Sequence, residues 1–121
     1  MPENVAILGA SAKPARYAYK AQVALLAHGH TPVPINPKYQ QIDGIQCFSN
    51  LKSVSVDIDT ITIYVRPEIL YSMSEDIIDI HPDRVIFNPG SESREIADRF
   101  ESVNITVQNA CTLVLLNTFS F

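Results

Sequence analysis

The chain has 121 residues, of which 46% are hydrophobic and 18% charged, with a net charge of −4. This length suffices for one domain with its own core and is too short for two ordinary domains, so we expect one domain over residues 1–121. The acidic balance argues against a duplex nucleic-acid binder. The apolar run LVLL near the C-terminus is far too short to span a membrane.

The first half of the chain predicts two strands and a helix. Residues 5–8 form a continuous apolar run, typical of a strand covered on both faces. Residues 17–28 predict a helix that Gly29 ends. Residues 31–35 (TPVPI) predict a second strand, although its prolines would remove hydrogen-bond donors. Residues 36–59 are rich in turn residues and predict an irregular segment, in which GIQCFSNL can hold a short extended piece.

The second half predicts three more strands and two or three helices. Residues 60–65 (TITIYV) have the composition of a strand. Pro67 and the acid after it suit the start of a helix. Residues 84–88 predict the fourth strand, and Ser91 can cap the helix that follows. Residues 104–109 predict the fifth strand, with a short helix closing the chain.

Strand and helix therefore alternate through five strands. Crossovers of this length give parallel strands, right-handed connections and helices on both faces of the sheet. We expect an α/β fold, a single doubly wound Rossmann-like domain with strand order 3-2-1-4-5. Ligands of such sheets bind beyond the carboxyl ends of the strands, where the strand order reverses. Five segments should meet there: Gly9-Ala10-Ser11, Asn36-Pro37-Lys38, Arg66-Pro67, Asn88-Pro89-Gly90 and Asn109-Ala110-Cys111.

The loop after the first strand, GASAKPAR, predicts a phosphate site. Gly9 lets the backbone approach a phosphate, and the next helix offers free N–H groups. The dinucleotide fingerprint would need glycines where Ser11 and Pro14 stand. A hydroxyl and two cations, Lys13 and Arg16, replace them, and their charge-assisted hydrogen bonds suit a pyrophosphate. The alternative is a simple strand-to-helix turn with surface cations.

The end of the second strand separates classes of nucleotide. An NAD site takes an acidic residue there to hold the ribose 2′-hydroxyl. This chain has Asn36, Pro37 and Lys38, with no acid and one lysine. An anion near the ribose is therefore favoured over a free diol, which fits NADP or another nucleotide with a ribose phosphate. A solvated lysine in a turn is the other interpretation of Lys38.

These segments together resemble the small CoA-binding protein family, whose Rossmann domain is similar to the CoA-binding domain of succinyl-CoA synthetase α subunits. The resembling residues are spread over almost the whole chain in the family's order: VAILGAS with Arg16 and Tyr19, PINPKY, GIQCFSNL, IYVRPE, Asn88-Pro89-Gly90 and NACTLVLL. The chain departs from the common pattern at Ala18, at the Asn88-Pro89-Gly90 turn and at Ala110. The resemblance implies the same fold and CoA, or an acyl-CoA, as the ligand.

The resemblance also implies roles for single residues. Those of the first loop (Gly9, Ala10, Ser11, Lys13 and Arg16) would face the CoA phosphates, and Asn36, Pro37 and Lys38 would surround the adenosine and its 3′-phosphate. Val65, Arg66 and Pro67 would flank the adenine or the start of the pantetheine arm, and Asn88, Pro89 and Gly90 would line the arm further on. Tyr19, with Tyr17 and Tyr39, is a candidate to stack on the base or cover the loop. Cys111 would lie near the end of the arm.

No catalytic set is recognisable. The histidines at 28, 30 and 81 suit a helix end and surface turns. The synthetases that the chain resembles use a phosphorylated histidine in a second domain, for which 121 residues leave no room. We therefore expect a free-standing, non-catalytic CoA-binding carrier, sensor or regulatory module. The alternatives are an NAD(P)-binding oxidoreductase-like protein, an acyl-CoA synthetase subunit that needs a partner chain, and an interaction domain that has lost its ligand.

Localisation and partners follow from composition. Two cysteines without metal spacing and an N-terminus without signal-peptide features predict a cytoplasmic protein with reduced thiols. The expected partner is a small nucleotide ligand, with no nucleic acid and no membrane. The apolar C-terminal stretch NTFSF allows a homodimer contact.

Overall fold

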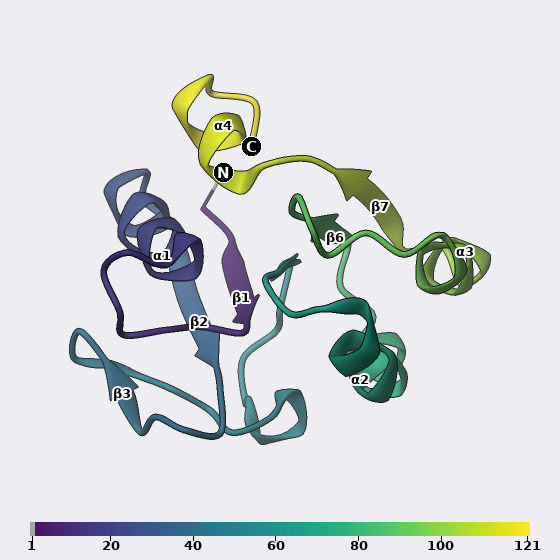
Figure 1. The fold of residues 1–121 in the computed structure, drawn as a ribbon, viewed down its shortest axis with the longest axis horizontal. Coiled ribbons are helices and arrows are strands. Elements are labelled where there is room, and N and C mark those ends of the chain that lie inside the picture. The colour runs from purple at the N-terminus through teal and green to yellow at the C-terminus, as the bar shows by residue number, and fades with distance from the viewer. Residues whose placement is uncertain (1) are drawn as a thin grey trace.

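The computed structural model describes residues 2–121 as five parallel strands with helices on both sides (Figure 1). The strands of the main sheet are β1 (Asn4–Leu8), β2 (Thr31–Ile35), β5 (Thr60–Ile63), β6 (Arg84–Phe87) and β7 (Thr106–Asn109). The helices are α1 (Tyr17–Ala27), α2 (Pro67–Ile80), α3 (Arg94–Ser102) and α4 (Thr112–Asn117). Between β2 and β5 lie a small hairpin, β3 (Gln41–Ile42) and β4 (Ile45–Gln46), and a 3₁₀ turn, η1 (Leu51–Ser53).

The strands lie in the order β2-β1-β5-β6-β7, and every neighbouring pair is parallel. The expected fold class is thereby confirmed. When the short extended piece at Phe48 is counted as the third segment, the order is 3-2-1-4-5-6, and β5, the run expected third, lies next to β1 as the fourth. Phe48 forms an isolated parallel bridge to Ile35 on the outer edge of β2. There the Phe48 N–H donates to the Pro34 carbonyl and the Asn36 N–H to the Phe48 carbonyl, each at 2.9 Å.

The two prolines of β2 are accommodated by the direction of their nitrogens. A residue's N–H and C=O point to the same side of a strand. Because the Pro34 carbonyl accepts from Phe48 on the outer edge, the nitrogen of Pro34 also points outward, and so does that of Pro32 two residues earlier. Neither proline therefore removes a donor from the ladder with β1.

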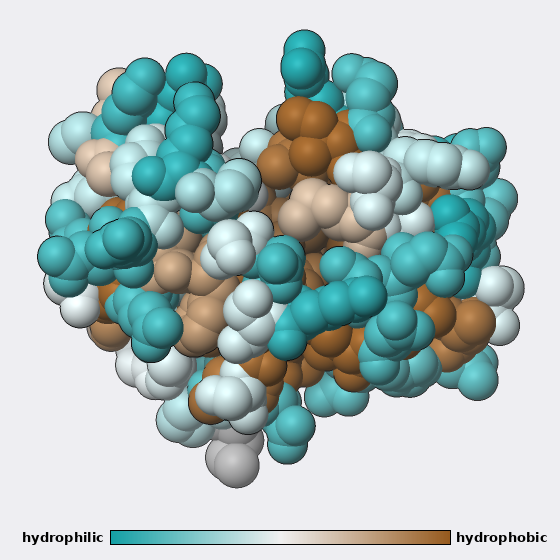
Figure 2. All heavy atoms as spheres, turned by 90° about the horizontal axis from the view of Figure 1, so that it is seen from below, coloured by the Kyte–Doolittle hydropathy of each residue, from teal (hydrophilic) through white to brown (hydrophobic). Residues whose placement is uncertain are grey.

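Helices cover both faces of the sheet. In Figure 1, α1 and α4 lie on one side of the strands and α2 and α3 on the other. Figure 2 views the molecule from below, and hydrophilic residues cover much of the right-hand half of that face, with apolar patches between them. No helix among residues 2–121 is long and apolar enough to cross a bilayer.

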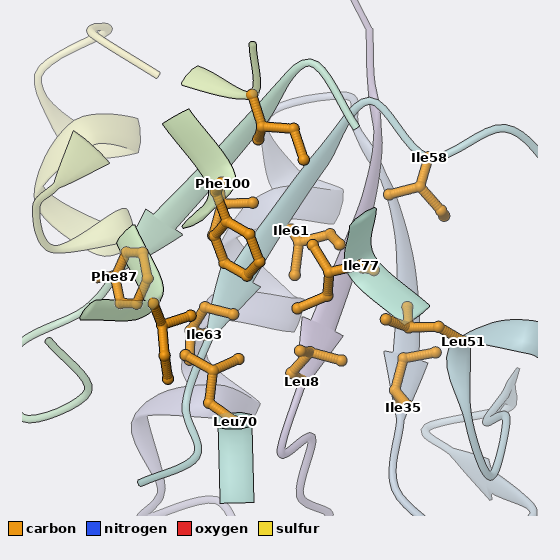
Figure 3. Close-up of a cluster of buried hydrophobic side chains, with 14 of the residues drawn as sticks. Leu8, Ile35, Leu51, Ile58, Ile61, Ile63, Leu70, Ile77, Phe87 and Phe100 are labelled. Carbon is orange, nitrogen blue, oxygen red and sulfur yellow. The ribbon is translucent and has the colours of Figure 1, made fainter. Parts of the chain in front are cut away.

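The larger core lies under α2 and α3. Figure 3 shows Leu8, Ile61 and Phe87 of the strands meeting Leu70 and Ile77 of α2. All five are fully buried. Each side chain of this kind contributes about 1.5–3 kcal/mol when it leaves water, so this core holds the strands in register beneath the carboxyl edge.

The N-terminal cap of α3 lies two residues later than the sequence predicts. The helix α3 is capped by Ser93, whose hydroxyl accepts from the Ile96 N–H at 3.3 Å. Ser91, expected as the cap, is instead buried, and its hydroxyl donates to the Asn88 carbonyl at 2.7 Å. The loop after β6 is therefore folded back on itself before the helix begins.

Candidate functional site

The chain turns at Gly9, directly after β1, in a way that only glycine permits. Its φ is +83°, and a Cβ at this position would lie 2.8 Å from both the Tyr64 carbonyl oxygen and Val65 Cγ1. On the other side, the N–H groups of Gly9 and Ala10 both donate to the Ile35 carbonyl, at 3.2 and 3.3 Å. The first loop is thus held between the ends of β2 and β5, as a close backbone approach requires.

Asn36 braces this loop from the end of β2. Its side-chain Nδ2 donates to the Ala10 carbonyl at 2.8 Å, and its Oδ1 accepts from the Lys38 N–H at 2.9 Å. The second bond is an Asx turn, which orders the backbone leading to Lys38. Asn36 therefore joins the two loops that the sequence assigned to phosphate and ribose.

These loops enclose a hollow of about 530 Å³ at the carboxyl edge of the sheet. Its volume falls within the range of about 300–1,000 Å³ that small-molecule sites occupy. Twelve residues line it: Gly9, Ala10, Ser11, Lys13, Ala15, Arg16, Tyr17, Ala18, Asn36, Lys38, Tyr39 and Tyr64. The structure therefore brings together the predicted residues of the first loop with Asn36 and Lys38.

The charged side chains that line the hollow are all cationic. Lys13, Arg16 and Lys38 are exposed, and the ion pairs formed within residues 2–121 involve other cations. None of the twelve lining residues is acidic, and the first turn of α1 has no acid either. The first N–H to bond within α1 is that of Lys20, so the amides at the helix start keep their partial positive charge. A chain of net charge −4 thus has a locally cationic hollow.

Two of the three candidate aromatic residues line the hollow. Tyr17 is 66% exposed beside it, and Tyr39 closes the side formed by the second loop. Tyr19 points elsewhere: its hydroxyl donates to Asp43 Oδ2 at 2.6 Å, in the turn between β3 and β4. That hydrogen bond is the main cause that raises the pKa of Tyr19. Tyr19 anchors the hairpin to α1 and does not line the hollow.

Sequence reasoning missed Tyr64. This residue follows β5 directly and lines the hollow. The residues around it in the sequence have the composition of a buried strand. Its hydroxyl oxygen is buried and makes no hydrogen bond of normal geometry. Burial raises the pKa of Tyr64 to about 12, and the nearby Thr112 and Thr62 hydroxyls oppose this shift in part. The only signal in the sequence was its place at the end of a strand.

Asn88 belongs to the framework of the edge. It is 2% exposed, and its Nδ2 donates to Thr62 Oγ1 at 2.6 Å and to the Ile63 carbonyl at 2.9 Å. Its Oδ1 accepts from the Thr112 N–H at 2.9 Å. The amide therefore connects β5, β6 and α4, and both of its ends are engaged inside the protein.

The remaining predicted residues lie outside the lining of the hollow. This set consists of Pro37, Val65, Arg66, Pro67, Pro89, Gly90 and Cys111. Val65 lies beside Gly9, where a Cβ would be 2.8 Å from its Cγ1. Arg66 directly precedes α2, and the Gly90 N–H donates to Glu92 Oε1 at 2.8 Å. Pro37 follows β2, and the others follow β5, β6 and β7 along the same carboxyl edge.

The two thiols differ in their surroundings. Cys47 is 7% exposed in the segment after β4, and burial raises the pKa of its thiol. Cys111 directly precedes α4 and is half-buried. Both thiols are free.

A sequence model of a known family, described as a CoA binding domain, matches residues 3–117. The chain belongs to this CoA-binding domain family. The residues of the hollow fit such a ligand, because its three cations are not neutralised by carboxylates and the amides at the start of α1 are free to donate. The resemblance seen in the sequence is thus confirmed at the level of the family.

Two curated proteins show the breadth of this family. Over 64 residues, 53% of the chain, it is 39% identical to an ADP-forming acetate–CoA ligase of Methanocaldococcus jannaschii, of which the match covers 9%. Over 77 residues, 64% of the chain, it is 26% identical to the uncharacterised protein YneT of Bacillus subtilis, of which the match covers 57%. The chain thus spans a small part of the ligase and just over half of YneT.

Solved structures share the fold over nearly the full chain. An uncharacterised protein of known crystal structure is 33% identical, with a TM-score of 0.93 and 99% of its chain covered. A hypothetical protein from Pyrococcus horikoshii OT3 is 27% identical, with a TM-score of 0.90, over 97% of this chain and 83% of that one. A dinucleotide-forming acetyl-coenzyme A synthetase of Ca. Korarchaeum cryptofilum is 21% identical, with a TM-score of 0.76, and 25% of it is covered. This last likeness concerns the fold alone.

Proposed function

We propose that the chain binds CoA or an acyl-CoA in the hollow at the carboxyl edge of its sheet. The observation that carries this proposal is the lining of the hollow, which holds Lys13, Arg16 and Lys38 and no carboxylate, in a chain that is acidic overall. CoA carries a pyrophosphate and a 3′-phosphate, and unpaired cations beside a helix N-terminus are suited to both.

The first loop is the proposed pyrophosphate site. Ser11 Oγ already accepts from the Lys13 N–H at 3.1 Å, so its hydroxyl proton remains free to donate to a phosphate oxygen. Lys13 and Arg16 supply the charge, and the free amides at the start of α1 supply further donors. No second or third glycine is needed for this arrangement, because side chains replace the close backbone contacts of a dinucleotide loop.

The second loop is the proposed adenosine site. Lys38, whose backbone is ordered by the Asx turn of Asn36, would pair with the 3′-phosphate, and Tyr17 or Tyr39 would stack on the base. No acidic residue lines the hollow to hold a free ribose diol, which disfavours NAD. The pantetheine arm would then run along the edge past Arg66 and Gly90 toward Cys111.

The proposed role is that of a free-standing cytoplasmic carrier, sensor or regulatory module. The two free thiols are in keeping with a reducing compartment. A second role, that of an acyl-CoA synthetase subunit completed by a partner chain, is favoured by the 39% identity to part of the acetate–CoA ligase. Co-purification of a larger chain that forms acyl-CoA only when both are mixed would select the second role.

Native mass spectrometry of the purified chain tests the ligand directly. We expect retained CoA or an acyl-CoA, identified by its mass after denaturation. The Lys13→Ala/Arg16→Ala double variant should lose this ligand while it stays folded, because both side chains are exposed. Lys52→Ala, which removes a lysine that pairs with Asp76 at 3.5 Å and does not line the hollow, is the control and should keep the ligand. Retention of ligand by the double variant would contradict the proposed site.

A further inference from the structure

The two edges of the main sheet differ in what lies beyond them. At the outer edge of β2, the Phe48 N–H donates to the Pro34 carbonyl at 2.9 Å and its carbonyl accepts from Asn36. Beyond β7, no strand of residues 2–121 pairs. The sequence of β7 is TVQN, and its register with β6 is unbroken. Proline, charge and bulges, which commonly keep an edge strand from pairing, are therefore absent from β7.

The ladder between β6 and β7 shows which groups of β7 face outward. The Thr106 N–H donates to the Asp83 carbonyl at 3.2 Å, so Thr106 and, two residues later, Gln108 point toward β6. Val107 and Asn109 point the other way. Their N–H and C=O groups have no hydrogen-bond partner among residues 2–121. The outer edge of β7 thus has the donors and acceptors that an added strand requires.

A hollow of about 370 Å³ lies between this open edge and α3. In Figure 1, α3 lies beside β7 at the right-hand end of the molecule. Val107 and Asn109 line the hollow from the strand, and Arg94, Ala97 and Glu101 line it from the helix. Because the three helix residues are spaced i, i+3 and i+7, they form one stripe, on the side of α3 that faces the open edge.

This stripe carries one cation and one anion, at opposite ends of α3. Arg94 and Glu101 are exposed, and neither takes part in an ion pair within residues 2–121. The other charged residue that lines the hollow, Glu92, is turned to its own loop, where its Oε1 accepts from the Gly90 N–H at 2.8 Å. An antiparallel copy of the same helix would set Arg94 against Glu101 at both ends.

The other charged residues of α3 lie off the stripe. Arg99 pairs with Glu75 of α2 on the far side of the helix. Glu95 and Asp98 are exposed and do not line the hollow. The side of α3 next to β7 is therefore the side that is complementary to itself.

We propose that a second copy of the chain pairs its β7 with this β7, antiparallel and around a two-fold axis, so that the two five-stranded sheets become continuous. With the two copies of Gln108 opposite each other, Val107 of each copy faces Asn109 of the other, and all their outward N–H and C=O groups are paired. The same axis sets Arg94 of each copy against Glu101 of the other. A single register thus satisfies both the strand edge and the charges, which selects a second copy as the partner.

This pairing leaves the proposed ligand site open. The ligand hollow lies at the ends of β1, β2 and β5, and β6 separates these strands from β7. In an antiparallel pair the carboxyl edges of the two sheets point in opposite directions, so neither ligand hollow faces the other. The contact also lies apart from the C-terminal stretch NTFSF, at which the sequence allowed a homodimer contact.

Sedimentation velocity without CoA tests the pairing through the charges. We expect dimers whose fraction grows with protein concentration. Arg94→Glu and Glu101→Arg should each raise the dissociation constant roughly tenfold or more, because each sets like charges against each other. Both variants should stay folded, since each new charge suits its end of the helix dipole. An equimolar mixture of the two should dimerise as the wild type does, because opposite charges then meet.

Glu95→Arg is the matched control, since it reverses a charge on the same helix away from the stripe, and it should dimerise as the wild type does. Asn109→Pro tests the strand edge. It removes an outward N–H without breaking the ladder with β6, as the prolines of β2 do, and should abolish the dimer. Circular dichroism checks that each variant is folded.

Four results would overturn the proposal. The wild type is monomeric up to millimolar concentration, the dimer survives Asn109→Pro, or the mixture of the two charge variants associates no better than either alone. The fourth is a complex with a different chain that Asn109→Pro abolishes while self-association is absent. Since the measurement contains no CoA, its outcome is independent of whether the chain binds that ligand.

Discussion

The Asn36 side chain donates to the Ala10 carbonyl at 2.8 Å and so fastens the end of the second strand to the loop after the first. This bond, with the Asx turn to Lys38, positions the two cationic loops of the hollow relative to each other. The sequence had suggested Asn36 as a contact of adenosine, and the structure shows that both ends of its amide serve the protein itself.

Asn36→Ala should therefore weaken CoA binding by loosening the hollow. Loss of its two hydrogen bonds should also lower the free energy of unfolding by about 1–3 kcal/mol. Asn50→Ala is the control, because Asn50 Oδ1 accepts from Ser53 in a similar local turn away from the hollow. Urea unfolding and CoA titration of both variants should show comparable stability losses and a loss of affinity for Asn36→Ala alone. An equal affinity loss in both would argue against the brace.

Gly9→Ala should lower the free energy of unfolding more than Gly29→Ala does. Both glycines have left-handed backbone, at φ +83° and +84°, so both substitutions cost about 1 kcal/mol or more from backbone strain. Only at Gly9 would the new methyl group meet other atoms, 2.8 Å from the Tyr64 carbonyl oxygen, whereas nothing lies within 4 Å at Gly29. Chemical unfolding should rank the two variants in that order, and equal losses would mean that the close approach is not maintained in solution.

Asn88→Ala should act on stability more than on affinity. The change leaves the Thr112 N–H without its buried acceptor and the Ile63 carbonyl without the Asn88 donor, at a cost of about 1–3 kcal/mol for each group left unsatisfied. The Thr62 hydroxyl loses the Asn88 donor and keeps its hydrogen bond with the Thr112 hydroxyl. Asn109→Ala, at an exposed position, is the control. A stable Asn88→Ala variant that fails to bind CoA would instead make Asn88 a ligand contact.

Mild acidification should lower the free energy of unfolding, because it protonates His30. Its Nδ1 accepts from the Glu3 N–H at 3.1 Å, and burial lowers its pKa, although the Glu3 charge acts in the opposite direction. In the unfolded chain His30 takes up a proton near its ordinary pKa of about 6.5, whereas in the folded chain it does so only at lower pH. The contribution of His30 to the free energy of unfolding is therefore fully present above about pH 6.5 and is lost as the pH falls through the folded pKa. Thermal melts between neutral pH and about pH 5 should show a shallower decline for His30→Gln. Identical slopes would remove His30 as the cause.

The sequence was sufficient for the fold because its strands differ so clearly from its helices. TITIYV and the apolar run before Gly9 predict buried parallel strands, and these strands form the middle of the sheet. The loop GASAKPAR predicted the hollow for a similar reason, since glycine, hydroxyl and cations occur together after a strand. Local composition thus predicts both the fold class and the position of the hollow.

Features that depend on tertiary contacts were beyond the sequence. In the sequence Tyr64 has the character of a strand residue, and only the fold shows that the turn at the end of β1 packs against its carbonyl. Asn88 has the character of a loop residue, and only the fold shows that its amide accepts from the first N–H of α4. The cap of α3 is Ser93 because Ser91 is drawn inward by the Asn88 carbonyl. In each case a neighbour distant in sequence decides the role of the side chain.

Calorimetric titration of the wild type and Lys38→Ala with CoA and dephospho-CoA tests the central claim most directly. The two ligands differ only in the 3′-phosphate, which Lys38 is proposed to hold. We predict that the wild type prefers CoA by about tenfold or more, as loss of one charge-assisted hydrogen bond implies, and that Lys38→Ala binds both ligands alike. Absence of CoA binding at millimolar concentration, or an unchanged preference in the variant, would contradict it.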